Sequence, residues 1–432
     1  MKIDPEERIL RCVEGEILDR APQMELGFNV WPSVKLNLYF DLLPKPLENW
    51  LLKLKIYEDA IQSSKEHLGL SVPMPKTLAR KVLPIDRLAA GLISFPTSLE
   101  FMKAFNPFLF RIPMRLGIDM VTVMGYPSVV VRGKLRRRKN LYFISEDWCL
   151  IDVDSIGDVR SVEPYDAPER QMERLIEAYR DDPLDDKIEY ISELQKSVAG
   201  KLVLTPIFNG IMESWHIIWG MSNMHLFFRH FMKEYRKGPP YGIYKKYLEE
   251  KSKFYVKYVK RLGEETDIKI ISIVEDVCED NGPFLPAAQY RNFFVPEIKR
   301  VVDAAHRGGM KVFFHTDGRF KIRNSERPWE FLDAILSTGI DMLHGCQQDC
   351  NNLKELKEYV GSKVTLVGGV SCVDVLQHAK SAKEVYWRAG QAINTLKEGG
   401  HYIVAADNGW HAGVRMENIR WYMKAVKYYG KY

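Results

Sequence analysis

Residues 311–319 read KVFFHTDGR, a short run of β-branched and aromatic residues that ends in polar ones. An apolar run of this length is typical of a buried strand, and the Asp-Gly pair that follows it favours a turn. His315, Asp317 and Arg319 therefore lie at the carboxyl end of the predicted strand. Parallel α/β barrels keep their catalytic side chains at this end of their strands. The stretch predicts a strand and, directly after it, a functional site.

Runs of this kind alternate with longer amphipathic stretches through the C-terminal part of the chain. We predict strands at 268–276, 311–315, 341–346, 364–368 and 402–406, and helices at 287–307, 328–337, 353–360, 383–398 and 416–429. Three earlier strands are predicted at 21–26, 118–124 and 201–206. Successive strand-helix units favour a parallel sheet. Eight strands predict an α/β fold of the (β/α)8 type, a TIM barrel.

The chain of 432 residues exceeds the roughly 250 that such a barrel needs, so about a third is predicted to be insertion. Residues 32–110 carry several prolines among helical segments and predict an N-terminal helical insertion, folded as a cap over the barrel mouth. Residues 127–153 predict a β-hairpin excursion, whose basic tip is either a solvated turn or a contact for phosphate or a partner protein. No flexible linker isolates these segments, so residues 1–432 are predicted to form one domain.

Charge and cysteine usage exclude several classes of protein. The net charge of +5 comes from 62 basic and 57 acidic residues mixed along the chain, which does not indicate nucleic-acid binding. The six cysteines have no framework-like spacing and are predicted to be reduced thiols. The N-terminus lacks an apolar signal segment, and no run of about 18 apolar residues could span a bilayer. We therefore expect a cytoplasmic protein without membrane contact.

His315 and Asp317 are two residues apart, so on an extended strand end they point to the same side. Such a pair can share a metal ion, or the aspartate can orient the histidine as an acid or base. Alternatively, Asp317 only begins a turn and His315 is a wall residue. His344 and Cys346 repeat the spacing at the next strand end, and adjacent barrel strands are expected to bring these four residues close together. The metal ligands predicted here are His315, Asp317 and Cys346, unless the cysteine is simply core.

A carboxylate pair, Glu275 and Asp276, ends the preceding strand, and its two members face opposite sides of that strand. One of them is expected to face the mouth, where it can bind a metal or take a proton, or else to cap a helix or form a salt bridge. Asn408 and His411 follow the last strand, where the same reasoning applies. The predicted catalytic residues are Glu275, Asp276, His315 and Asp317.

Another strand end, near residue 209, is rich in aromatic residues. These residues can line an aromatic substrate pocket with a polar anchor, or they belong to a helix packed under the cap. The residues predicted to bind substrate are Phe208, Asn209, Glu213, Trp215, His216, Trp219, Arg319, Asn408 and His411.

Several segments, taken in order, resemble the uroporphyrinogen decarboxylase superfamily. They are PEERILRCVEGEILDRAP at 5–22, the stretch 274–319 that ends in HTDGR, STGIDMLHGCQ at 337–347, KVTLVGGVS at 363–371 and GGHYIVAADNGWHAGVRMENI at 399–419. The resemblance covers roughly the last 170 residues well. It implies a (β/α)8 barrel with its site at the C-terminal mouth. The superfamily includes true decarboxylases and cobamide-dependent methyltransferases.

The residues at the family's functional positions distinguish these branches. True decarboxylases carry arginines just after the first strand to bind porphyrinogen carboxylates, whereas residues 26–31 here read LGFNVW. Thiol methyltransferases hold zinc with a His-x-Cys and a distant Cys, and these positions match His315, Asp317 and Asn408. Two of the three ligands are therefore altered. The resemblance favours a harder His/carboxylate site, or none, over a thiolate-activating zinc.

The branch that remains resembles the O-demethylase methyltransferases. It implies transfer of a methyl group from a methoxylated aromatic compound to the Co(I) of a corrinoid (cobalamin) on a separate corrinoid protein, with zinc as a further candidate cofactor. No cobalamin-binding module is evident within this chain. A homodimer is one possible assembly of this chain. The alternatives are a methyltransferase from methyl-corrinoid to a thiol such as coenzyme M or to a tetrahydropterin, a carboxy-lyase, and a binding subunit without activity.

Overall fold

A computed structural model describes residues 3–26, 110–124, 133–137, 140–144, 149–153, 159–220, 223–411 and 413–432. Eight parallel strands form one sheet, in the order in which they occur in the chain. They are β1 (Met24–Glu25), β2 (Met120–Met124), β7 (Val203–Asn209), β8 (Ile270–Val274), β11 (Lys311–His315), β12 (Met342–His344), β13 (Thr365–Val370) and β14 (Tyr402–Ala406). A parallel bridge between Gln23 and Val404 joins the two ends of the sheet. The predicted (β/α)8 barrel is confirmed, and every predicted strand overlaps one of these eight, although β7 and β13 each run two or three residues beyond the predicted end.

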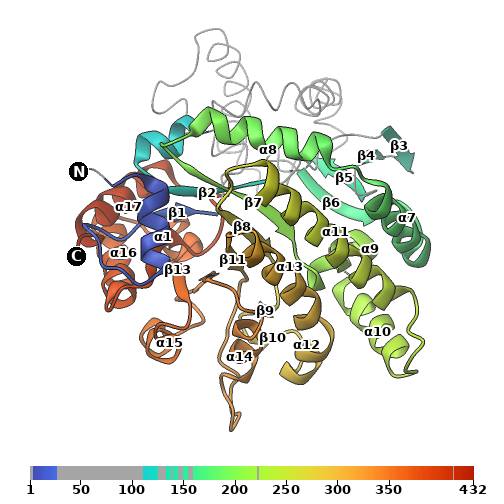
Figure 1. Ribbon diagram of the computed structural model, residues 1–432. Helices are drawn as coiled ribbons and strands as arrows, with labels where there is room; N and C mark the ends of the chain where they lie inside the picture. Colours follow the sequence, from blue (N-terminus) through green and yellow to red (C-terminus); the bar gives the residue numbers. More distant parts are fainter. Residues whose placement is uncertain are drawn as a thin grey trace, which may run out of the picture.

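Helices surround this sheet (Figure 1). They are α7 (Pro168–Asp181), α8 (Asp185–Val198), α9 (Trp215–Trp219), α10 (Met224–Tyr235), α11 (Ile243–Glu265), α12 (Ala287–Phe293), α13 (Val295–Arg307), α14 (Glu330–Leu336), α15 (Leu353–Val360), α16 (Ala382–Lys397) and α17 (Met416–Tyr429). The first helix, α1 (Pro5–Val13), begins at Asp4, whose side chain accepts a hydrogen bond from the Glu7 N–H. Its residues Ile9, Cys12 and Val13 pack against the side chains inside the barrel, so α1 closes the amino end.

Side chains alternate between the inside and the outside of the barrel along each strand. Phe313 and Met342 belong to the inner cluster. Phe314 and Leu343 belong to the outer cluster, which packs against the helices. The same alternation places His315 and His344, the last residues of β11 and β12, inside the barrel near its carboxyl end. Which residues of a strand face inward therefore decides which of the predicted site residues reach the mouth.

The junction of the first and last strands is held by the buried carboxyl group of Glu25. Glu25 accepts hydrogen bonds from the Tyr422 hydroxyl at 2.9 Å, the Gln23 amide at 3.1 Å and the Ala406 N–H at 3.3 Å. These contacts tie β1 to β14 and to α17, the last helix. Burial raises the pKa of Glu25 to about 8 in spite of these donors.

A second, antiparallel sheet contains β3 (Gly133–Arg137), β4 (Asn140–Ile144), β5 (Cys149–Val153) and β6 (Val159–Pro164). Strands β3 and β4 pair as a hairpin within the predicted range 127–153. The excursion is larger than predicted, because β5 and β6 extend it to four strands and β6 lies beyond residue 153. The predicted helical cap at 32–110 lies outside the described residues except for its last residue, and the single-domain division stays a prediction. None of the described helices is both long and apolar enough to cross a membrane.

Candidate active site at the barrel mouth

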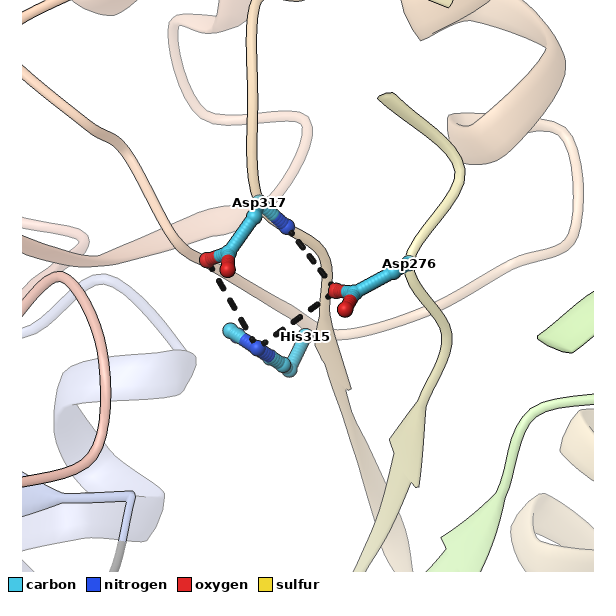
Figure 2. A group of neighbouring side chains, drawn as sticks. All are labelled: Asp276, His315 and Asp317. Atoms are coloured by element: carbon cyan, nitrogen blue, oxygen red, sulfur yellow. Dashed lines mark hydrogen bonds and ion pairs between the residues drawn. The ribbon is translucent and has the colours of Figure 1, made fainter. Parts of the chain in front are cut away.

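Three of the predicted residues, Asp276, His315 and Asp317, meet at the carboxyl end of β8 and β11 (Figure 2). Strand pairing sets His315 beside Val274, so the residues two positions further on, Asp317 and Asp276, also become neighbours. The His315 Nε2 atom lies 3.8 Å from Asp276 Oδ1 and 3.7 Å from Asp317 Oδ1. The Asp317 N–H donates to Asp276 Oδ1 at 3.3 Å. A candidate ligand atom from each residue lies within 4.8 Å of the other two.

This group is buried at its base and more open above. The His315 side chain is only 4% exposed, whereas those of Asp276 and Asp317 are 34% and 27% exposed. Because the histidine lies at the strand end and the carboxylates lie two residues beyond it, a molecule that enters the mouth meets the carboxylates first. Such an arrangement can bind a cation or exchange a proton with a bound substrate.

Asp317 has one oxygen engaged and one without a hydrogen bond. Its Oδ2 accepts a hydrogen bond of 2.8 Å from the Asn408 side-chain amide. Its Oδ1 is buried and has no hydrogen-bond partner among the described residues. Burial, and next the negative charge of Asp276, raise the pKa of Asp317 to about 8, although the Asn408 hydrogen bond opposes the shift. Near neutral pH the carboxyl group of Asp317 therefore keeps its proton, unless a bound cation displaces that proton.

The residues present fit a hard divalent metal ion. Two carboxylates and one imidazole are oxygen and nitrogen donors, the ligand types that suit zinc, manganese or iron(II) ions. The unpartnered Asp317 Oδ1 faces the Nε2 atom of His315, and a cation would satisfy both. The second ring nitrogen of His315 also has a hydrogen-bond partner, as in metal-binding histidines, since its Nδ1 lies 2.7 Å from Nδ1 of His344.

Glu275 faces the opposite side from Asp276, as the strand alternation requires. It is fully buried, and its Oε1 accepts a hydrogen bond of 2.7 Å from the Met212 N–H. Burial raises the pKa of Glu275 to about 7. Its predicted catalytic role is corrected: Glu275 holds the loop after β7 from behind the barrel wall, and Asp276 is the member of the pair at the mouth.

Glu213 and His216 lie behind Asp276. The Glu213 carboxylate is 3.4 Å from the Asp276 N–H, which donates to it, and 3.5 Å from Nε2 of His216. Burial, then the negative charges of Asp276 and Glu275, raise the pKa of Glu213 well above its usual value. Burial lowers the pKa of His216 to about 4. The pair therefore supports the acidic side of the site without adding a positive charge to it.

Two of the aromatic residues predicted to line a substrate pocket do not face the barrel mouth. Phe208 points outward and packs edge-on against Tyr255 and Tyr258 of α11, because alternate residues of β7 face the helices. Trp219 donates from its indole N–H to the Tyr244 hydroxyl at 3.0 Å. Phe208 is thus an outer core residue and not a substrate contact, and Trp219 is tied to α11.

Two other members of this segment remain near the mouth. Trp215 is buried and packs edge-on against Phe284, in the loop that follows β8. Asn209 ends β7 and is exposed. Asn209 is therefore the member of this predicted set whose side chain is most open to a ligand.

The remaining predicted residues make contacts outside the central group. The Arg319 guanidinium donates to the Asp280 carbonyl at 2.9 Å. His411 accepts a hydrogen bond of 3.1 Å from the Gly413 N–H. Cys346 is not part of the metal-capable group, in which Asp276 is the third member. The Cys346 thiol is fully buried, lies 3.7 Å from the Leu343 carbonyl oxygen, and has its pKa raised to about 12 by burial.

His344 was expected near His315 but was not among the residues predicted to form the site. The sequence pattern His344-Gly345-Cys346 drew attention to the cysteine, but the histidine is the residue that contacts His315. The expected closeness follows from strand register, since His315 and His344 end adjacent strands and pair directly. Gly345 supports this closeness: its φ is +99°, and a Cβ here would lie 1.9 Å from the Thr316 carbonyl oxygen. Only glycine allows the two loops to approach in this way.

Comparison with known proteins agrees with this architecture. Residues 165–429 match the uroporphyrinogen decarboxylase (URO-D) family. The chain belongs to that family. The match includes strands β7 to β14 and therefore all three residues of the central group, so the resemblance predicted from the sequence is confirmed. None of the curated proteins matches this sequence.

Two solved structures are similar to this family member to different degrees. A methyltransferase from Methanosarcina mazei has 14% sequence identity and a TM-score of 0.56, with 99% of each chain covered. A D-psicose 3-epimerase from Clostridium cellulolyticum H10 has 12% identity and a TM-score of 0.37, with 75% of this chain and 92% of that chain covered. The first of them shares its fold with the described part of this chain.

Proposed function

We propose that this URO-D family member is a methyltransferase that cleaves the methyl–oxygen bond of a methoxylated aromatic compound. The methyl group passes to the Co(I) of a corrinoid carried by a separate protein. The observation that supports this proposal is the donor set at the mouth, in which two carboxylates and one imidazole replace the soft thiolates expected of a thiol-activating site. Hard donors match an oxygen leaving group better than a sulfur one.

The chemistry of an aryl methyl ether explains the need for such a site. When the carbon–oxygen bond breaks, its electron pair goes to the aryl oxygen, and an uncompensated phenolate is a reluctant leaving group. The site must supply a proton or a positive charge to that oxygen as the nucleophile takes the methyl group. Asp317 keeps its proton near neutral pH, because its pKa is about 8. Transfer of that proton yields the neutral phenol and leaves the Asp317 carboxylate.

A metal ion would serve the same oxygen. Asp276, His315 and Asp317 are the residues that would hold it, and it would supply Lewis acidity at the mouth. In either case Asn408 keeps Oδ2 of Asp317 engaged, so that Oδ1 is the atom directed at the reaction. Asn209, exposed at the end of β7, is placed to contact the donor molecule.

Two alternatives fit these contacts less well. The described residues near the central group include the carboxyl groups of Asp276, Asp317 and Glu213, and Arg319 is engaged with a backbone carbonyl. Whether protonated or not, these carboxyl groups offer no positive charge to a polyanionic substrate such as a porphyrinogen. Thiol activation needs a thiolate ligand at the metal, whereas Cys346 is buried away from the group.

The test is an anaerobic incubation with a Co(I) corrinoid protein and a panel of methoxybenzoates. Conversion of the corrinoid spectrum to methyl-Co(III), with an equal amount of phenol by chromatography, is the expected result. Phenol release without any corrinoid would overturn the proposal. Demethylation of added methylcobalamin by a thiol or pterin would assign the reverse direction, and CO2 release alone would assign a carboxy-lyase.

The ligand assignment has a matched test of its own. Asp317→Asn should lower bound metal if the central group holds it, whereas Cys346→Ser should leave the metal content unchanged. Loss of metal from the Cys346 variant alone would restore the thiolate site and the thiol alternative.

A further inference from the structure

We propose that His344 is a positioning residue that holds His315 in one tautomer, with the proton on Nδ1 and the lone pair of Nε2 directed at Asp276 and Asp317. The proposal deepens the proposed function, because it names the residue that decides what His315 can do at the mouth. It concerns the position of a proton and can be tested without any substrate.

The hydrogen-bond chain starts at a backbone oxygen that can only accept a hydrogen bond. The carbonyl oxygen of Ala406, at the end of β14, lies 2.9 Å from Nε2 of His344. A carbonyl oxygen can only accept, so Nε2 of His344 carries a proton. The ring of His344 is fully buried and its other near neighbours include the ring of Phe313, at 5.2 Å between centroids. An apolar site of this kind favours the neutral imidazole, which leaves Nδ1 as an acceptor.

The second link passes this constraint to His315. The two Nδ1 atoms lie 2.7 Å apart, a distance at which one must donate and the other accept. Because Nδ1 of His344 is the acceptor, Nδ1 of His315 is the donor. The opposite tautomer of His315 would set two lone pairs against each other at this distance. In the neutral ring, Nε2 of His315 is then the unprotonated atom.

The free lone pair has a consequence for the chemistry. Nε2 of His315 lies 3.7 Å from Asp317 Oδ1 and 3.8 Å from Asp276 Oδ1. A lone pair beside two carboxylates favours a cation between them, or a proton on Asp317. The neutral ring of His315 can therefore bind a metal or accept a proton at Nε2, but it has no proton to donate from that atom. This restricts His315 to an accepting role in the proposed reaction.

The decisive measurement is a two-bond proton–nitrogen NMR correlation on the full chain labelled with ¹⁵N-histidine, at pH 7 with chelator and without substrate. Comparison with His315→Gln and with the His344 variants assigns the two rings among the 10 histidines. We expect a protonated Nδ1 and an unprotonated Nε2 for His315, and the reverse for His344. A proton on Nε2 of His315, whether with or without one on Nδ1, would overturn the proposal.

Two substitutions separate the tautomer role from simple packing. His344→Asn keeps an acceptor, Oδ1, on the atom that bears Nδ1 in histidine, whereas His344→Phe keeps the ring and removes the acceptor. The asparagine variant should keep the His315 tautomer, and the phenylalanine variant should lose it. If the phenylalanine variant keeps that tautomer, His344 does not set it. Should the phenylalanine variant not fold, the wild-type spectrum still decides.

Turnover adds a second readout that rests on the proposed function. By analogy with the loss of an outer-shell partner of a site, we expect His344→Phe to lower the demethylation rate by about 10- to 100-fold. His344→Asn should stay within about threefold of the wild type, and exposed His378 provides the control substitution. The expected NMR pattern without any demethylation would contradict the proposed function and leave the tautomer proposal standing.

Discussion

Asn408, just beyond strand β14, donates a hydrogen bond of 2.8 Å to Oδ2 of Asp317, just beyond β11. The contact reaches across the barrel mouth, because β12 and β13 lie between these two strands. It leaves Oδ1 of Asp317 as the oxygen that faces His315. The site can therefore direct one defined oxygen of this carboxyl group at a substrate or a cation, and several predictions about activity depend on that oxygen.

Replacement of Asp317 by Asn should lower kcat for demethylation by roughly 10²- to 10⁴-fold, the usual contribution of a positioned acid or base. The amide cannot release a proton at neutral pH, although its size is almost unchanged. Initial rates of phenol release measure the effect. Asp280→Asn, an exposed aspartate in the neighbouring loop, is the control and should retain the wild-type rate. Equal losses in both variants would show that Asp317 has no special role.

The pH dependence of the rate follows from the raised pKa of Asp317. The protonated form is the proposed donor, and its pKa is about 8, so the rate should fall as pH rises through about 8. Asn408→Ala removes a hydrogen bond that stabilises the carboxylate, and it should therefore move this descending limb to higher pH. Profiles of kcat against pH for both proteins provide the measurement. A limb that moves to lower pH in the variant would contradict the assignment.

The adjacent residues Glu275 and Asp276 should respond differently to the same chemical change. Asp276→Asn removes a candidate ligand and should weaken Mn²⁺ or Zn²⁺ binding by at least about tenfold, since even the loss of an outer-shell partner has an effect of that size. Glu275→Gln should leave metal binding unchanged, because Glu275 faces the Met212 N–H behind the wall. Isothermal titration of each variant measures its metal affinity. A larger loss of affinity in Glu275→Gln than in Asp276→Asn would reverse the assignment.

Phe208 and Asn209 form a matched pair for the corrected substrate contacts. Phe208→Ala should destabilise the fold by about 3–5 kcal/mol, the usual cost of emptying a buried phenylalanine site, because its ring packs against α11. Asn209→Ala should leave the free energy of unfolding nearly unchanged and raise KM for the methyl donor. Chemical denaturation and steady-state kinetics distinguish the two. If the Phe208 variant is stable and has a raised KM, Phe208 contacts the substrate and the correction is wrong.

Buried Glu25 should make the stability depend on pH. Its folded-state pKa is about 8, above the value of the unfolded chain, so the folded state retains this proton when the unfolded state has lost it. The free energy of unfolding should therefore fall as pH rises from about 4.5 to 8, by up to about 1.4 kcal/mol per pH unit from this group. Glu25→Gln should remove that part of the slope. The control, Glu279→Gln at an exposed position, should keep the wild-type slope. If the free energy of unfolding has the same slope against pH in the wild type and in both variants, Glu25 is not its source.

The sequence was sufficient to predict the barrel and the place of its site. Short apolar runs that alternate with amphipathic stretches identified all eight strands, because strand and helix periods differ. His315 and Asp317 were correctly expected on one side of a strand end, since residues two apart share a face. The family also followed from segments that need no tertiary contact to be recognised.

The tertiary structure decided which neighbours of these residues face the mouth. Strands of a parallel barrel are apolar on both faces, so the sequence around Ile271 and Ser272 carries no alternation that reveals its phase. A change of phase by one residue exchanges Glu275 for Asp276, and Phe208 for Asn209. Register between strands likewise paired His315 with His344, although 29 positions separate them. Contacts between strands depend on how the closed barrel packs, and that information is distributed over the whole chain.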